Sequence, residues 1–181
     1  MKKYKKDYEM VFKRQANGKV KEEVEYIGNY YISQLSIKEL RKRKIYYLAL
    51  SLCSIIILTI IGILDTPGSR IFYVALPYSC LFLPSVFSLI GTIRFLFVGE
   101  KIEFIDYDKT RNRVRKSTIG IIMISLLIVI GDVFFILSKQ PIEKHQVELL
   151  FLTGVFLILV LNILFFKIQK QEIFKIEEPV Q

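Results

Sequence analysis

The stretch QLSIKELRKRKIYYLALSL, residues 34–52, has the pattern of a polar helix start that continues without a break into a membrane span. Ser36 and Glu39 have the S-x-x-E spacing of a capping box, in which each side chain bonds to the backbone N–H of the other residue. No proline interrupts the apolar run that follows. We therefore expect one helix over residues 37–64, with its first two turns in water and the remainder in lipid.

The composition is that of a chain in which apolar and charged blocks are kept apart. Of its 181 residues, 52% are hydrophobic and 24% are charged, and the mean hydropathy is +0.41. A membrane span needs about 20 apolar residues to cross about 30 Å of hydrocarbon. Four blocks meet this requirement: residues 45–64, 71–98, 117–137 and 149–166. The sequence predicts an all-α membrane protein with four transmembrane helices in an antiparallel up-down arrangement.

The spans divide the chain into three parts. Residues 1–35 form an N-terminal segment, residues 36–166 form the transmembrane domain, and residues 167–181 form a C-terminal tail. We expect the tail and the N-terminal segment to lie on the same side, because four spans return the chain to the side on which it started.

The N-terminal segment has the pattern of a small β-hairpin. Asn17-Gly18 is typical of a two-residue type I′ turn, which would place Val11 opposite Val24. An isolated hairpin is marginally stable in water, so it needs a surface to pack on, and the alternative is a flexible tail. The candidate surfaces are two other polar segments, residues 101–108 and 172–178.

Lys and Arg residues are unevenly divided between the two sides of the predicted bundle. The side that carries both termini has 22 of them, the other side has 3, and one lies inside a span. By the positive-inside rule, both termini are cytoplasmic. The same rule accounts for the net charge of +9, so we expect no binding to nucleic acid. The Lys- and Ile-rich composition favours a multi-pass protein of a bacterial plasma membrane.

Two basic clusters lie directly next to spans on the predicted cytoplasmic side. Such clusters attract anionic lipid headgroups, although they also serve as topology signals and need do nothing else. The candidates for contact with anionic membrane lipids are Arg41, Lys42, Arg43, Lys44, Arg111, Arg113, Arg115 and Lys116.

Polar side chains inside a span are costly and are therefore candidates for function. Arg94 lies near the cytoplasmic end of the second span, where it can extend to the headgroups, and Asn162 lies at a similar depth in the fourth. We expect these two to be partners. Asp132 lies in the outer third of the third span, where we expect it to meet water, Arg70 or Lys139.

Small side chains in the first two spans are expected to face other helices. We interpret Cys53 and Cys80 as packing residues of this kind, like Ser54 and Gly91. No metal-ligand, nucleophile or phosphate-binding motif occurs, and His145 is the only histidine. We therefore expect no enzymatic activity, no cofactor and no metal site.

Two classes of function remain open. The first is an accessory, scaffold or regulatory membrane protein whose cytoplasmic side binds a partner protein. The second is a small proton- or cation-coupled transporter that acts as a homo-oligomer, with Asp132 as the coupling residue. We favour the first class, because it requires no intramembrane chemistry and suits a chain with most of its polar residues on one side.

Overall fold

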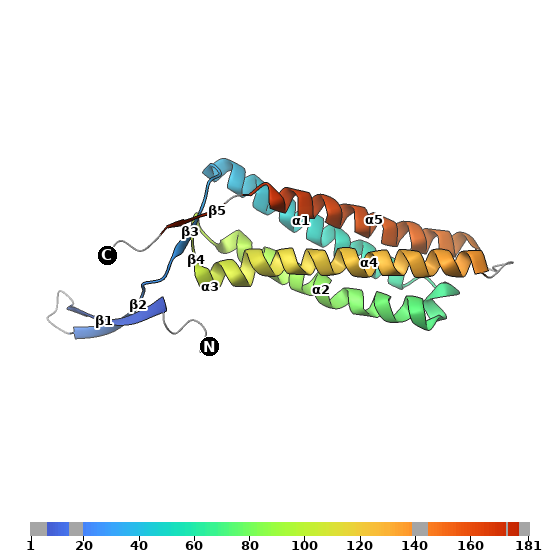
Figure 1. Cartoon of the computed structure of the whole chain (residues 1–181), viewed down its shortest axis with the longest axis horizontal. Helices are drawn as coiled ribbons and strands as arrows, with labels where there is room; N and C mark the ends of the chain where they lie inside the picture. Colours follow the sequence, from blue (N-terminus) through green and yellow to red (C-terminus); the bar gives the residue numbers. More distant parts are fainter. Residues whose placement is uncertain (1–6, 15–19, 139–144, 173, 178–181) are drawn as a thin grey trace.

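The structure is a computed structural model that describes residues 7–14, 20–138, 145–172 and 174–177. Four helices of 26 residues each form its main body: α1 (Ile37–Gly62), α2 (Phe72–Phe97), α4 (Arg113–Ser138) and α5 (His145–Lys170). All four are long and apolar enough to cross a membrane, as predicted. They run alternately up and down as an elongated bundle (Figure 1).

The helices form a ring in which each one packs on two neighbours. α1 contacts α2 and α5, and α4 contacts the same two helices from the other side of the bundle. A short helix, α3 (Phe104–Tyr107), and a π-helical turn, η3 (Asp108–Asn112), lead directly into α4. At the opposite end, the turn η2 (Gly68–Arg70) joins α1 to α2. We call this the turn end of the bundle, and the end next to the strands the sheet end.

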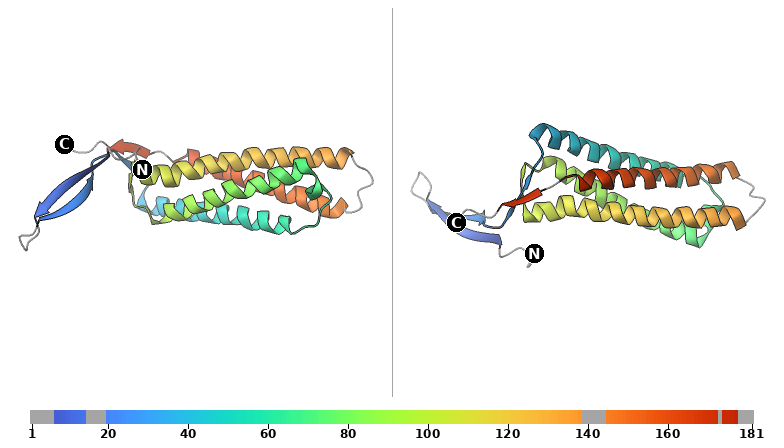
Figure 2. Two further views of the ribbon diagram at one scale, coloured as in Figure 1. Left: turned by 90° about the horizontal axis from the view of Figure 1, so that it is seen from below. Right: turned by 45° about the horizontal axis from the view of Figure 1, so that its top comes forward.

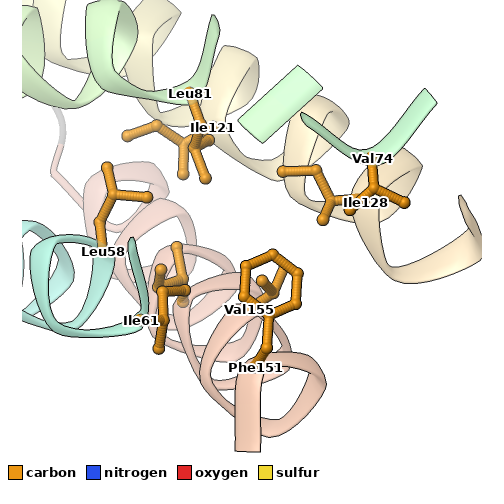
Figure 3. Close-up of a cluster of buried hydrophobic side chains, with 9 residues drawn as sticks. Leu58, Ile61, Val74, Leu81, Ile121, Ile128, Phe151 and Val155 are labelled. Atoms are coloured by element: carbon orange, nitrogen blue, oxygen red, sulfur yellow. The ribbon is translucent and has the colours of Figure 1, made fainter. Parts of the chain in front are cut away.

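The centre of the bundle is filled by branched and aromatic side chains from all four helices. Figure 3 shows them converging: Leu58, Ile61, Val74, Leu81, Ile121, Ile128, Phe151 and Val155. Many other apolar side chains point outward and are exposed, including Leu83 at 64% and Leu127 at 57%. Helices that are apolar on the outside as well as the inside are suited to a lipid environment.

Small polar side chains complete the helix contacts. Ser54, Ser88 and Gly91 are buried between helices, which agrees with their interpretation as packing residues. Cys53 and Cys80, which received the same interpretation, lie instead on the exposed outer surface. Cys53 directly precedes the buried Ser54, and Cys80 directly precedes the buried Leu81. Because successive side chains of a helix point in different directions, each cysteine is turned outward.

Two small antiparallel sheets lie at the sheet end (Figures 1 and 2). One is the hairpin of β1 (Tyr8–Arg14) and β2 (Val20–Tyr26). The other has the strand order β4-β3-β5, with β3 (Tyr30–Ser33) between β4 (Lys101–Glu103) and β5 (Phe174–Glu177). The two polar segments expected to support the hairpin do contribute strands, but both pair with β3.

The hairpin is present, but its register differs from the one expected. Met10 is opposite Val24 and Val11 is opposite Glu23, which is a shift of one residue. Residues 15–19 join the strands and lie outside the described residues, so the predicted Asn17-Gly18 turn does too. The base of the hairpin explains the register: Tyr8 and Tyr26 are paired, their ring centroids 5.2 Å apart.

These two tyrosines fix the hairpin to the bundle. The Tyr8 hydroxyl donates a hydrogen bond to Glu103 at 2.9 Å, and the Tyr26 hydroxyl accepts one from the Phe104 amide at 3.1 Å. Burial and the contact with Glu103 raise the pKa of Tyr8 to about 12, so its hydroxyl stays protonated at neutral pH. A shift of one residue reverses the face of every side chain, and the anchored face is the one that carries the tyrosines.

Candidate functional sites

Two buried carboxyl groups meet at the turn end. Asp132 of α4 and Glu148 of α5 are both 0% exposed and interact with each other. The amide of Gly68 donates a hydrogen bond to Glu148 Oε2 at 3.0 Å. Two carboxylates buried together repel, so the pair is stable only when it holds a proton or binds a cation.

The turn η2 closes over this carboxyl pair. A Cβ atom added to Gly68 would overlap Glu148 Oε1 and would lie 2.8 Å from Asp132 Oδ1, so the glycine allows the backbone to approach both groups. Thr66 in the same turn is also fully buried. The backbone of this turn therefore lies directly against the carboxyl pair.

Asp132 does not have the surroundings expected from the sequence. Arg70 is exposed and forms an ion pair with Asp65 at 2.8 Å, which turns it away from the carboxyl pair. Lys139 lies outside the described residues. The partner of Asp132 is instead Glu148, which the sequence did not indicate because it lies one residue before the predicted fourth span. The available signal was its depth: antiparallel neighbours place Asp132 and Glu148 at the same end of the bundle.

A second buried polar cluster lies at the sheet end. Arg111, in η3, donates hydrogen bonds to the Tyr47 hydroxyl at 2.8 Å and to the carbonyl oxygen of Gln169. Its guanidinium also forms an ion pair with Glu172 at 3.2 Å, and the two side chains are 6% and 0% exposed. The side-chain amide of Gln169 donates to Thr118 Oγ1 at 3.0 Å. The cluster joins α1, η3, α4 and the end of α5.

Arg111 and Glu172 hold opposite charges in a buried position. Burial raises the pKa of Glu172, while the Arg111 guanidinium acts in the opposite direction. Breaking such a pair leaves one uncompensated charge, so the cluster fixes the geometry at the sheet end. Arg111 and Glu172 are far apart in the sequence, so only the folded chain brings them together.

The structure separates the predicted lipid-contact residues into two groups. Arg111 is inside the cluster just described, and Lys44 is 9% exposed and donates to the carbonyl oxygen of Val98. These two are buried and committed to protein contacts, and the half-buried Arg43 also donates to the carbonyl oxygen of Ile168 at 3.1 Å. The other six are exposed or half-buried at the sheet end, and their contact with lipid stays a prediction: Arg41, Lys42, Arg43, Arg113, Arg115 and Lys116.

The expected pair of Arg94 and Asn162 is not formed. Asn162 is 1% exposed, and its side-chain amide donates to Ser54 Oγ at 3.1 Å and to the Ile158 carbonyl at 2.9 Å. Arg94 is exposed and lines a cavity at the sheet end. Helix rotation explains the difference, because residues at the same depth meet only when both face the same neighbour.

One face of the hairpin carries three apolar side chains that are largely uncovered, beside the exposed Glu22. Met10, Phe12 and Val24 lie on the same face and are 69%, 64% and 65% exposed. Tyr8 and Tyr26 continue this face toward the bundle, where they are anchored. We call Met10, Phe12 and Val24 the hairpin face.

No family model, no curated protein and no solved structure matches the chain. Among the described residues, no group of three or more His, Cys, Asp or Glu side chains is placed to hold a metal ion.

Proposed function

We propose that this chain is an accessory or regulatory membrane protein that binds a partner protein through the hairpin face on the cytoplasmic side. The observation that carries the proposal is the exposure of Met10, Phe12 and Val24, at 64–69%, on one face of an anchored hairpin. Contiguous exposed apolar side chains in a water-exposed segment are typical of protein interaction sites.

The anchoring of the hairpin supports this proposal. The contacts of Tyr8 with Glu103 and of Tyr26 with Phe104 hold the base of the hairpin against the bundle. The outer part of the hairpin extends beyond the helices, as Figures 1 and 2 show. A two-stranded sheet of this kind is marginal by itself, and a partner that covers its apolar face would stabilise it.

Site-specific photocrosslinking in intact cells tests the proposal. A photoreactive residue at Phe12 should give one discrete crosslinked product with another protein, and one at Glu9, on the opposite face, should not. Met10→Ser together with Val24→Ser should remove the product while the helical content stays unchanged. Equal crosslinking from both faces, or no product from position 12, would contradict a partner-binding hairpin face.

A second candidate function, proton-coupled transport by a homo-oligomer, is supported by the carboxyl pair. Asp132 and Glu148 are buried side by side and can hold a proton between them. Transport would require η2 to move, because Gly68 lies directly against both carboxyl groups. We place this candidate second for that reason.

Proton flux into proteoliposomes distinguishes the two candidates. If the chain is a transporter, Asp132→Asn abolishes the flux and leaves the fold intact. If it is an accessory protein, the wild-type chain and Asp132→Asn both give the flux of empty liposomes.

A further inference from the structure

A cavity of about 630 Å³ lies at the sheet end, between the last turn of α2 and the segment that leads into α4. Its charged lining has both signs: Arg94, Lys101 and Lys109 are cationic, and Glu103 and Asp106 are acidic. Neither of the two candidate sites at the ends of the bundle uses these residues for an ion pair. A ligand that carries both a negative and a positive group would match this lining.

Two of the cations are available to a ligand. Lys101 is already paired with Glu177 at 2.8 Å and lies over the Tyr30 ring at 4.3 Å. By contrast, Arg94 and Lys109 have no hydrogen-bond or ion-pair partner among the described residues. They come from α2 and η3, so the cavity holds two unpaired donors on different elements. Donors of this type bind phosphate.

The acidic side of the cavity makes a purely anionic ligand a poor fit. Glu103 accepts a hydrogen bond from Tyr8 and has further acceptor capacity, since an ionised carboxylate has about four lone-pair sites. Asp106 lines the same cavity one turn before Thr110. These carboxylates favour a ligand with N–H donors close to its phosphate.

The cavity opens beside an apolar helix face. Phe87, Ile90 and Phe97 are 44%, 37% and 86% exposed, and they lie seven and four residues before Arg94 and three after it. This spacing places all of them on the Arg94 face of α2. Fatty acyl chains could therefore lie along α2 while the polar part of the same molecule occupies the cavity.

From this arrangement we infer that the cavity binds the headgroup of a phospholipid that carries both a phosphate diester and a primary ammonium group, as phosphatidylethanolamine does. Arg94 and Lys109 bind the phosphate, and Glu103 and Asp106 accept hydrogen bonds from the ammonium. The acyl chains pack on the α2 face that carries Phe87 and Ile90. This site differs from the general attraction between anionic lipid and exposed cations, because it requires both signs of charge.

Native mass spectrometry of the full chain in mild detergent tests the inference. The chain is offered equimolar phosphatidylethanolamine, phosphatidylcholine and phosphatidylglycerol with identical acyl chains, and the first of these should bind in preference. Arg94→Gln should weaken its binding about fivefold, on the order of one lipid-facing cation. Lys38→Gln is the matched control, because Lys38 is an exposed cation at the same end of the bundle but lies outside the cavity and outside the predicted lipid-contact residues.

Further variants and a soluble ligand separate the alternatives. Lys109→Gln should reproduce the loss from another element, and Asp106→Asn should reduce the preference over phosphatidylglycerol. Free phosphoethanolamine at the same concentration should not displace the lipid, because it lacks acyl chains. Displacement by it would show that the ligand is a soluble phosphate ester and overturn the lipid inference. Equal binding of the three lipids, or unchanged binding by Arg94→Gln and Lys109→Gln, would overturn it as well.

Discussion

Arg111 is the residue whose position most changes its interpretation. By sequence it is one of several cations next to a span, and in the structure its guanidinium is buried among Tyr47, Gln169 and Glu172. A cation with these neighbours orders the sheet end of the bundle. The exposed cations near it, such as Arg115 and Lys116, remain available to lipid.

Replacement of Arg111 should destabilise the chain strongly. Arg111→Met leaves the buried Glu172 carboxylate without its counter-charge, and we expect a loss of about 3–5 kcal/mol in the free energy of unfolding. Arg111→Met combined with Glu172→Gln removes both charges and should recover most of that loss. Thermal or denaturant unfolding in mild detergent measures both values. Additive losses in the double variant would mean that the two residues do not interact.

Gly68 is the second residue with a structural requirement that can be tested. Gly68→Ala would force the backbone of η2 away from Asp132 and Glu148, and overpacking of this kind costs about 1–3 kcal/mol. Gly120→Ala is the control, since its added Cβ would lie 3.6 Å from the nearest atom, an ordinary contact. Unfolding in detergent should separate the two variants. Equal stability of both would show that η2 does not lie against the carboxyl pair.

Among the elements, the start of α1 agrees most closely with expectation. Ser36 is the N-cap, its hydroxyl accepts a hydrogen bond from the Glu39 amide at 3.4 Å, and Glu39 accepts one from the Ser36 amide at 3.2 Å. The helix begins at Ile37 as predicted and ends at Gly62, two residues earlier than expected. A capping box is formed by residues three apart, so the sequence alone defines it.

Loss of the cap should affect the first turns of α1 and nothing deeper. Ser36→Ala should cost about 1 kcal/mol and accelerate hydrogen exchange of the amides of residues 37–42. Insertion of the chain should be unchanged, because the apolar run that drives it is untouched. Gln34→Ala, at an exposed position just before the cap, should leave exchange at the wild-type rate. Unchanged exchange in Ser36→Ala would place the helix start elsewhere.

The whole molecule has a strongly asymmetric distribution of charge and structure. Among the described residues, both sheets and most Lys and Arg residues lie at one end of the bundle, and the opposite end carries the turn η2. The sheet β4-β3-β5 joins three segments that are far apart in the sequence. This arrangement agrees with a chain whose polar parts occupy one side of a membrane.

Cysteine labelling tests the predicted orientation. In a Cys53→Ala, Cys80→Ala background, a cysteine placed at Arg70 should react with a membrane-impermeant reagent in intact cells. A cysteine at Glu9 should react only after the membrane is permeabilised, because the termini are expected in the cytoplasm. Both positions are exposed in the structure, so accessibility within the protein does not limit either reaction. The reverse labelling pattern would refute the orientation.

The four helices, their alternation and the cap of α1 were determined by the sequence, because each depends on residues that are close together in the chain. A span needs a continuous apolar run whose backbone is satisfied internally, and a cap needs two residues at fixed spacing. The strands at residues 101–103 and 174–177 were also recognisable as candidates. The sequence did not indicate that both strands pair with β3, because this pairing joins segments that are far apart in the chain.

Only the tertiary structure decided the polar contacts. The depth of Asp132, Asn162 and Arg94 follows from helical rise, but their partners depend on how each helix is rotated about its axis. Asp132 faces Glu148, and Asn162 faces Ser54. Arg94 faces a solvent-accessible cavity. These helices carry apolar side chains on every side, so the hydrophobic pattern does not indicate which side of a helix faces its neighbours. The rotation of each helix about its axis is therefore set by close packing among all four helices. The register of the hairpin was decided in the same way, by the anchoring of Tyr8 and Tyr26 on the bundle.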